Sequence, residues 1–552
     1  MADHFSSPRA RRLLFAIGLC ALTILAYRPA WNGGFVWDDD RYVTHNSLLT
    51  ARDGLQRIWF SVDAPSQYFP LSYTLLRAER ALWSLNTTGY HWVNILFHAA
   101  NALLLWRILV RLKVPGALLA AAIFALHPVQ VESVAWISEL KNVLMAFFFL
   151  LTLVVWLEYV DLPARDKRRW CLYTAALACF ALALLAKSTA CTLPAALLLI
   201  LWLRRQRISG RTFLEIVPFV VFALGSGLLA IWWEKYHQGT RVLPSLGLLE
   251  RILIASRAPW FYLSKIFWPS NLTFIYPQWK INSTDPSAYF GLLAIVVAAV
   301  LIYFARRSFG RGLEVAALFF VATLSPVIGF IMLYTFRYTY VADHYQYLAS
   351  IGPIALFSAG ATILTKRLRQ SNWVGAAGTA MILGSLALLA WRQSGMYRDI
   401  ETLWRTTIAR NPNCWMAYNN LGAIQIEKGS VDDAIAKYEH ALALNPDYPE
   451  AHYNLGAALL QKGKIEEAVR HCETALRLQP NEPDVHVVLG NALLTKGDVD
   501  LAIEHYRRAL QVRPEDYNAH FNLGVALQQK GDTAQAAVEF KTAQELGPNQ
   551  ER

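Results

Sequence analysis

The chain has 552 residues, 55% of them hydrophobic, and a mean hydropathy of +0.28, which is too apolar for a single soluble globular protein. Its formal net charge of +12 is unevenly spread, because residues 398–552 carry −6 and residues 1–397 therefore carry +18. Basic residues collect beside membrane spans, so this distribution predicts a membrane domain and disfavours nucleic-acid binding. The six cysteines show no disulfide or metal-binding pattern.

Apolar segments of about the length that crosses a membrane, roughly 20 residues, follow one another up to residue 391. Every second gap between them contains a basic cluster, at residues 9–12, 107–113, 165–169, 204–211, 306–311 and 366–369. By the positive-inside rule, these gaps are cytoplasmic. We predict eleven spans, the first of them uncleaved, at residues 12–30, 92–110, 115–134, 143–160, 171–189, 191–203, 213–233, 288–305, 312–333, 347–365 and 373–391.

The segment 251–279, RILIASRAPWFYLSKIFWPSNLTFIYPQW, allows two interpretations. It is apolar enough for a span, but Arg257, Lys265 and its aromatic residues suit an interfacial or re-entrant segment better. Eleven spans from a cytoplasmic N-terminus place the C-terminus outside the cytoplasm. A twelfth span here would reverse that placement.

The C-terminal part repeats every 34 residues, which is the tetratricopeptide period. A proline and the glycine of a Leu-Gly pair recur at this spacing, as Pro412, Pro446, Pro480, Pro514 and Pro548, and as Gly422, Gly456, Gly490 and Gly524. We predict a membrane domain at 1–397, a connecting helix at 398–414 and an α-solenoid of four repeats at 415–552. Such stacks form concave peptide-binding surfaces.

Three adjacent carboxylates, Asp38, Asp39 and Asp40, follow the first span on its predicted outer side. An acidic side chain costs about 2.5–3.5 kcal/mol at the centre of a bilayer, so this run must lie in water or in a polar cavity. Repulsion between adjacent carboxylates also raises the pKa of at least one of them unless a cation compensates. Taken alone, the run is most simply a solvated loop that caps the next helix.

Further polar residues fall at the outer ends of later spans. A single lysine in such a place is usually a membrane anchor, and a single histidine is usually a packing residue. Their shared outer placement instead favours one hydrated site. These residues are His127, Glu132, Lys141, Lys187, Asp343, His344 and Tyr345.

Six motifs in series ahead of the repeats resemble the transmembrane and tetratricopeptide-containing O-mannosyltransferases and their bacterial relatives. The motifs are WDDDRYVTHN, QYFPLSYTLLRAERALWSLNTTGYHWVNILFHAANALL, ALHPVQVESVAWISELKN, LLAKSTACTLP, KIFWPSNLTFIYP and VADHYQYLAS. The resemblance implies the GT-C superfamily, which transfers sugars from polyprenyl-phosphate donors. It also implies an all-α fold with about eleven spans and an extracytoplasmic tail.

The resemblance implies roles for individual residues as well. The acidic pair of the first outer loop, the catalytic feature of the family, corresponds to Asp38 and Asp39. Lys187, Lys265 and His344 correspond to residues that bind the lipid phosphate, although bacterial relatives tend to have Arg where His344 stands. The same donor site is expected to include Tyr345, Asp343, Glu132 and His127.

A carboxylate pair suits sugar transfer to a hydroxyl group. One carboxylate takes the acceptor proton, and a water-poor cavity raises its pKa toward that task. The phosphate leaving group needs cations rather than a protonating acid. We assign the base to Asp39 and the partner role to Asp38, although the sequence does not distinguish them and leaves open whether a divalent ion assists.

Asparagines in helix A of the repeats offer a site for the acceptor. Asn420, Asn454 and Asn522 precede a Leu-Gly pair, and Val488 interrupts the series. An amide both donates and accepts, so this row is similar to an asparagine ladder that holds a peptide backbone. The alternative is that asparagine is only tolerated there.

These features together predict an inverting glycosyltransferase of the bacterial inner membrane. It would move a sugar to a Ser or Thr hydroxyl of a protein on the periplasmic face, with the repeats binding the acceptor and lipids surrounding the spans. Mannose is implied only by the eukaryotic branch of the family. A membrane-anchored scaffold without catalysis remains the main alternative, and a transporter is disfavoured because the polar residues lie mainly on one side.

Overall fold

The computed structural model describes residues 8–62, 65, 67–163, 165–206, 209–237, 246–331, 334–368 and 372–547. The chain forms two compact units, 1–403 and 404–552. The described residues form helices and no strand, so the all-α prediction is confirmed. Sequence analysis ended the membrane domain at 397, whereas the division falls inside helix α16, Ile400–Arg410. Arg207, Arg369 and Pro548, which contribute to the predicted patterns, lie outside the described residues.

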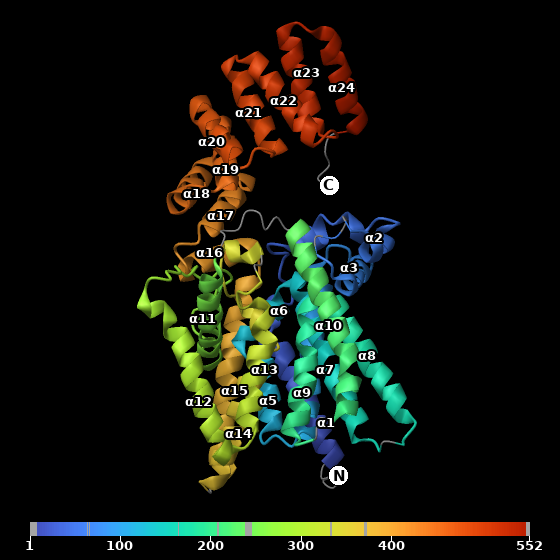
Figure 1. Cartoon of the computed structure of the whole chain (residues 1–552). Helices are drawn as coiled ribbons and strands as arrows, with labels where there is room; N and C mark the ends of the chain where they lie inside the picture. Colours follow the sequence, from blue (N-terminus) through green and yellow to red (C-terminus); the bar gives the residue numbers. More distant parts are fainter. Residues whose placement is uncertain are drawn as a thin grey trace, which may run out of the picture. The chain divides into compact units, whose positions relative to one another are not determined.

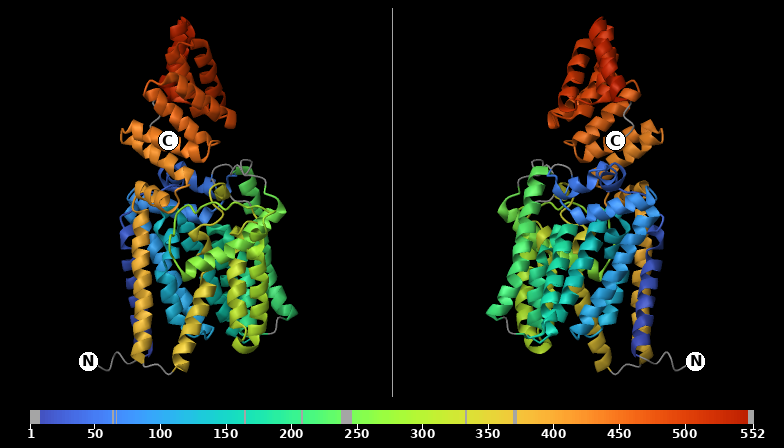
Figure 2. Two further views of the ribbon diagram at one scale, coloured as in Figure 1. Left: turned by 90° about the vertical axis from the view of Figure 1, so that its left-hand side faces the viewer. Right: turned by 90° about the vertical axis from the view of Figure 1, so that its right-hand side faces the viewer.

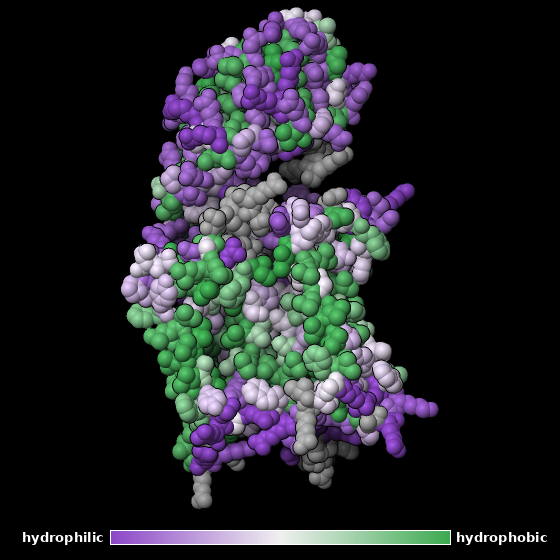
Figure 3. Space-filling view, viewed as in Figure 1, coloured by the Kyte–Doolittle hydropathy of each residue, from purple (hydrophilic) through white to green (hydrophobic). Residues whose placement is uncertain are grey.

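Unit 1 is a bundle of helices that run roughly along one direction (Figures 1 and 2). Apolar side chains cover the middle of this bundle, and hydrophilic ones gather at its lower end in Figure 3. Its main helices are α1 Pro8–Ala26, α4 Thr87–Arg111, α5 Ala117–Leu126, α6 Val131–Ala135, α7 Leu140–Asp161, α8 Arg168–Ala186, α9 Leu193–Leu203, α10 Gly210–His237, α12 Phe290–Phe309, α13 Gly312–Leu324, α14 Ile351–Arg367 and α15 Asn372–Ser394.

Not all of these helices qualify as membrane spans by length and composition. Six do so among the described residues, at Thr87–Arg111, Ile137–Asp161, Arg168–Ala186, Gly210–His237, Pro286–Phe309 and Trp373–Tyr397. The pair formed by α5 with the following segment Pro128–Ala135, bent by 54°, would make a seventh. Helices occupy the other four predicted spans as well, but α1, α9, α13 and α14 do not meet the criterion. Spans are therefore present, and their number of eleven stays a prediction.

Ion pairs bring the predicted basic gaps together at one end of the bundle. Arg111, at the end of α4, and Arg204, just after α9, both contact Asp161 at the end of α7. Arg169, at the start of α8, lies 3.7 Å from Glu215 in the first turns of α10. We call this the basic end. The start of α7, the end of α8 and the end of α10 consequently lie at the opposite end.

Helix α11, Leu248–Phe267, belongs to the segment with two interpretations. The turn between α12 and α13 lies at the basic end, because the Arg311 guanidinium donates to the backbone carbonyl of Trp202 at 2.9 Å. The start of α12 therefore lies at the same end of the bundle as the end of α10. The chain between them leaves and returns on one side, so α11 is not a twelfth crossing in this structure.

Two short helices and two single-turn segments complete the part of unit 1 that surrounds the site. Helices α2, Gly54–Phe60, and α3, Pro70–Trp83, follow the acidic run. The 3-10 turns Ser325–Val327 and Asp343–Gln346 lie near the two ends of the connection between α13 and α14. Helices α2 and α3 lie at the end opposite the basic end (Figure 1), and both turns contribute residues to the cavity lining at that end.

Unit 2 contains four antiparallel helix pairs, which we number repeats 1 to 4. Each glycine of a Leu-Gly pair is required by close packing: a Cβ added at Gly490 would lie 2.6 Å from the ring of Tyr506. The predicted four-repeat solenoid is confirmed. The pairs are α17 Trp415–Glu427 with α18 Val431–Leu444, α19 Pro449–Gln461 with α20 Ile465–Leu478, α21 Pro483–Lys496 with α22 Val499–Val512, and α23 Tyr517–Lys530 with α24 Thr533–Leu546.

Candidate functional site

A cavity of about 560 Å³ lies in unit 1, at the end of the bundle opposite the basic end. Its apolar wall comes from the last turns of α8 and from the second half of α10. Its polar wall comes from the loop after α1, the start of α7 and the segment 334–345. The polar and charged side chains that line the cavity include Asp38, Arg41, Gln67, Glu139, Lys141, Lys187, Glu234, His344 and Tyr345.

The two predicted catalytic acids are placed differently. Asp38 lines the cavity, while Asp39 does not and is fully buried. The Asp39 carboxylate accepts backbone N–H bonds of 2.8 Å from both Val36 and Ser138. Asp39 therefore ties the loop after α1 to the start of α7. Sequence analysis gave the base role to Asp39, but the geometry favours Asp38 for contact with a substrate.

The surroundings affect the pKa of both acids. Burial raises the pKa of Asp39 to about 7, although the two backbone hydrogen bonds lower it. Burial also raises the pKa of Asp38, and the positive charges of Lys141 and Arg41 lower it. A carboxylate with a raised pKa can hold a proton in the pH range of most enzymes.

Two lysines share one buried carboxylate on the polar wall. The Lys141 ammonium lies 3.0 Å from Glu139 Oε1, and the Lys187 ammonium lies 3.3 Å from Glu139 Oε2. Glu139 is only 1% exposed. Because one negative charge faces two positive charges, this group keeps an excess of one positive charge beside the cavity.

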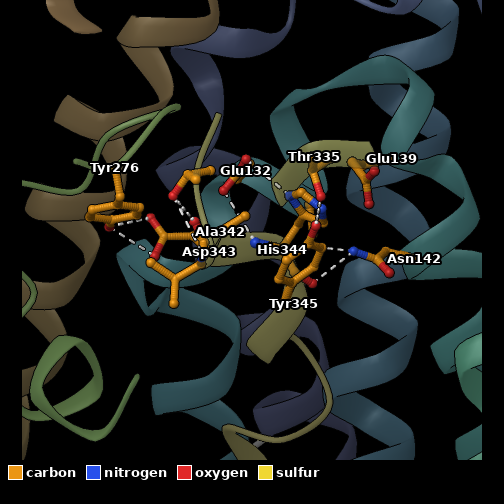
Figure 4. A network of polar contacts seen from close by, with 12 residues as sticks. Glu132, Glu139, Asn142, Tyr276, Thr335, Ala342, Asp343, His344 and Tyr345 are labelled. Carbon is orange, nitrogen blue, oxygen red and sulfur yellow. Dashed lines mark hydrogen bonds and ion pairs between the residues drawn. The ribbon is translucent and has the colours of Figure 1, made fainter. Parts of the chain in front are cut away.

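A second group of polar contacts holds the predicted residue His344 in place (Figure 4). The ring Nδ1 of His344 lies 3.0 Å from Glu132 Oε1, and its backbone N–H donates to Glu132 Oε2. The Asn142 amide donates to the backbone carbonyl of His344 at 2.9 Å. Asn142 also accepts a 2.9 Å bond from Lys187, so its side chain joins the two groups.

Tyr345 and Asp343, on either side of His344, differ in position. The Tyr345 hydroxyl lines the cavity and lies 2.5 Å from the Thr335 hydroxyl. Asp343 is buried away from the lining, where the Tyr276 hydroxyl donates to both of its carboxylate oxygens at 3.0 and 3.1 Å (Figure 4). Burial raises the pKa of Asp343 well above its ordinary value. Asp343 therefore fixes the turn that carries His344.

The structure does not bring Lys265 and His127 to the cavity. The Lys265 ammonium donates to the backbone carbonyl of Ser270 at 2.8 Å and lies 5.3 Å from the centre of the Tyr276 ring. His127 Nε2 donates to the backbone carbonyl of Ile266 at 2.8 Å. Both side chains hold α11 and the segment after it against their surroundings, rather than facing a ligand.

Sequence analysis missed several residues of the site. Glu139 and Asn142 lie in SELKN, where the apolar helix α7 begins, and polar residues at such a boundary were the available signal. Arg41, Gln67 and Glu234 gave no signal, because each is an ordinary loop or helix-end residue in the sequence. Only the folded chain places them around one cavity.

The predicted asparagine row bonds within unit 2. Asn454 donates to the side chain of Asn419 at 3.0 Å, and Asn522 donates to Asn491 at the same distance. Asn420 donates to the backbone carbonyl of Met416. The bonds of Asn454 and Asn522 link the first helices of adjacent repeats, whereas the bond of Asn420 lies within α17. Peptide binding by the row stays a prediction. No group of three or more metal-ligating side chains that could hold an ion occurs among the residues that the structure describes.

Both units are similar to known proteins. Models of the TPR repeat match residues 422–463 and 490–531, and models of the tetratricopeptide repeat match 449–482 and 517–550. Human protein O-mannosyl-transferase TMTC4 is 24% identical over 499 residues, which cover 76% of this chain and 64% of the relative. The homologues of this chain are protein O-mannosyl-transferases. The family resemblance of the six motifs is thereby confirmed.

Other protein O-mannosyl-transferases extend the comparison. One from Caenorhabditis elegans is 23% identical over 79% of this chain and 63% of its own length. Drosophila melanogaster Tmtc1 is 24% identical over 76% of this chain and 60% of its own length. The chain thus spans slightly less than two thirds of these protein O-mannosyl-transferases. Among solved structures, MamA is 26% identical over 26% of this chain, with a TM-score of 0.25.

Proposed function

We propose that the chain is a glycosyltransferase that moves a sugar from a polyprenyl-phosphate donor to a hydroxyl group of a protein. The names of the homologues support transfer of a sugar to protein. The observation that carries the proposal for this chain is the cavity, which combines a polar wall that holds Lys141 and Lys187 with a long apolar wall. A lipid-linked sugar phosphate has the same two-part character.

The charge of the polar wall supports a phosphodiester donor. Glu139 neutralises one of the two positive charges of Lys141 and Lys187, which leaves an excess of one. A polyprenyl-phosphate sugar is a phosphodiester and carries one negative charge. The ammonium groups of Lys141 and Lys187 would stabilise this phosphate as opposite charges.

The apolar wall supports a lipid tail. Leu184, Phe222 and Leu229 contribute side chains to it, and Gly225 and Gly227 leave part of the wall as bare α10 backbone. A Cβ added at either glycine would meet no other atom within 4 Å. An isoprenoid chain would gain about 25 cal/mol for each Å² of apolar surface that it buries there.

The proposed reaction uses Asp38 as the base. As the bond between the anomeric carbon and the phosphate oxygen breaks, the acceptor oxygen bonds to that carbon from the opposite face, and its proton passes to Asp38. The bonding electrons leave with the phosphate, which Lys187 and Lys141 stabilise. Asp39 acts as a positioning residue, because it holds the loop that carries Asp38. Because the acceptor attacks the face opposite the phosphate, the configuration at the anomeric carbon is inverted.

The proposed location is the bacterial inner membrane. Lysine and arginine at the basic end would face the cytoplasm, and the cavity would then open to the periplasm. The tetratricopeptide repeats would bind the protein acceptor on that side. A membrane-anchored scaffold is the competing function, and it predicts that Asp38 tolerates replacement.

The test uses purified full-length protein with a polyprenyl-phosphate hexose as donor and Ser/Thr-containing peptides as acceptors. Asp38→Asn should abolish transfer. Asp40→Asn is the matched control, because Asp40 belongs to the same acidic run but is exposed and bonds to Thr44. Equal transfer by the wild type and Asp38→Asn would reject the catalytic assignment, and absence of transfer by the wild type with intact peptide binding would favour the scaffold.

A further inference from the structure

Repeats 2, 3 and 4 each join their two helices by a polar side-chain pair with a spacing of 19 residues. Two of the pairs are histidine with histidine, and the third is histidine with glutamate. The bonded atoms are Nδ1 of His452 and of His471 at 2.9 Å, Nδ1 of His486 and of His505 at 3.0 Å, and Nδ1 of His520 with Oε2 of Glu539 at 2.6 Å.

A backbone carbonyl fixes the tautomer of the first histidine in each pair. Nε2 of His452 lies 2.9 Å from the carbonyl oxygen of Pro446, and Nε2 of His486 lies 3.2 Å from that of Pro480. Each Nε2 must therefore carry the hydrogen, which it donates. In the neutral ring, Nδ1 is then an acceptor, and His471 must donate its own Nδ1 hydrogen to His452.

This arrangement limits how many protons a closed His–His pair can hold. A first added proton can bind Nε2 of His471 without disturbing the bond between the rings. A second proton has only Nδ1 of His452 to bind, where it removes the acceptor and places two N–H groups and two positive charges face to face. The pair must open to take it.

The third pair responds in the opposite way. When His520 is protonated, its Nδ1 carries a hydrogen and donates to the Glu539 carboxylate, which is a charge-assisted bond. A proton on Nδ1 of His520 therefore makes a bond in this pair rather than removing one. Repeat 1 has Tyr418 and Lys437 at the same positions and so has no histidine pair there.

Neighbouring charges do not reverse this behaviour. Burial lowers the pKa of His471, and the positive charges of His452 and Arg470 lower it further, while Glu467 raises it. Burial lowers the pKa of His505 to about 4, with His486 and Arg508 acting in the same direction and Glu504 opposing them. Burial and Arg508 also lower the pKa of His486, against the carbonyl of Pro480.

We propose that the His452–His471 and His486–His505 pairs form an acid-sensitive latch that loosens repeats 2 and 3, while the His520–Glu539 pair keeps repeat 4 closed. The latch rests on contacts within unit 2 alone and holds whether or not the chain transfers a sugar. A periplasmic location would expose it to external pH.

The direction of the effect follows from proton binding. Unfolded histidines have a pKa of about 6.5, so near pH 5 an open pair holds two protons and a closed pair holds at most one. The open state binds more protons, and the stability of the closed state therefore falls as pH falls. The loss begins below about pH 6.5.

The test measures hydrogen exchange along the full-length chain, because exchange reports opening segment by segment. Protection factors at about pH 7.5 and about pH 5.5, corrected for the intrinsic exchange rate, bracket the titration of histidine. We expect protection in α19–α22 to fall several-fold on acidification. Protection in α23–α24 should change little.

Repeat 4 supplies the matched variants. His471→Glu together with His505→Glu copies the His–Glu pair into repeats 2 and 3 and should abolish the loss of protection in acid. Glu539→His copies the His–His pair into repeat 4 and should transfer the acid sensitivity to α23–α24. Equal loss in all repeats, or no change in Glu539→His, would overturn the proposal. The single variant keeps the test decisive even if the double variant does not fold.

Discussion

The backbone N–H of Ser138 donates a 2.8 Å hydrogen bond to the carboxylate of Asp39, 99 positions earlier in the chain. This bond joins the loop after α1 to the start of α7, and both border the cavity. The neighbour Asp38 thereby reaches the cavity wall, although Asp39 itself does not. Adjacent carboxylates are therefore placed differently: Asp39 holds the loop, and Asp38 lines the cavity.

Asp39→Asn should destabilise the protein, because an amide group can replace only one of the two oxygens that accept backbone hydrogens. A buried N–H left without its acceptor costs about 1–3 kcal/mol. Thermal unfolding in detergent should show a lower midpoint for Asp39→Asn than for Asp38→Asn. The reverse order would show that Asp39 does not hold the loop.

The pH dependence of stability should reveal the buried carboxyl of Asp39. Its pKa rises from 3.8 to about 7 on folding, so between these values the folded state binds more protons than the unfolded state. Stability therefore falls as pH rises through this window. In Asp39→Ala this contribution to the slope should disappear, as measured by chemical unfolding at a series of pH values. An unchanged slope would contradict the raised pKa.

Glu139→Gln should leave two buried lysines without their shared counter-ion. Removing one partner of a buried ion pair costs about 3–5 kcal/mol. Glu139→Gln combined with Lys141→Gln restores the charge balance and should recover part of the loss. A double-mutant cycle measures this coupling, and purely additive effects would show that the carboxylate and Lys141 act independently.

Asn142→Leu should weaken donor binding, because Asn142 bonds both Lys187 and the backbone of His344. A hydrogen bond to a charged group contributes about 1.5–3 kcal/mol, which corresponds to roughly a 10- to 100-fold change in affinity. The expected signature is a raised KM for the donor with a smaller change in the KM for the acceptor. Asn142→Asp can still accept from Lys187 but adds a negative charge beside it, so this variant should also weaken donor binding.

The repeat glycines should differ in their tolerance to alanine. A Cβ at Gly490 would lie 2.6 Å from the rigid ring of Tyr506, whereas at Gly456 it would meet the smaller Cys472 sulfur at 2.6 Å. Overpacking costs about 1–3 kcal/mol. Gly490→Ala should therefore lower the unfolding midpoint of unit 2 more than Gly456→Ala. Equal effects would show that the ring moves as easily as the thiol.

Local patterns in the sequence determined the helical architecture. A 34-residue period specifies helix pairs, because each pair must present the same packing surface to the next. Apolar length and alternating basic gaps likewise located the helices of the bundle and their common direction. The ends of α9 and α13 were less predictable, since short apolar helices lack the length that marks a span.

The tertiary structure decided the site. Asp38, Lys187 and His344 were predicted from their places at the ends of apolar segments, and all three line the cavity. His127 has the same local signature, and Lys265 was predicted through the family resemblance, but both bond to backbone carbonyls elsewhere. Local sequence gives the type of a side chain and its place relative to the ends of the apolar segments. Its partners come from distant parts of the chain, as Glu132 and His344 show. Those contacts form only when the bundle closes, so only the folded chain shows which charges share a cavity.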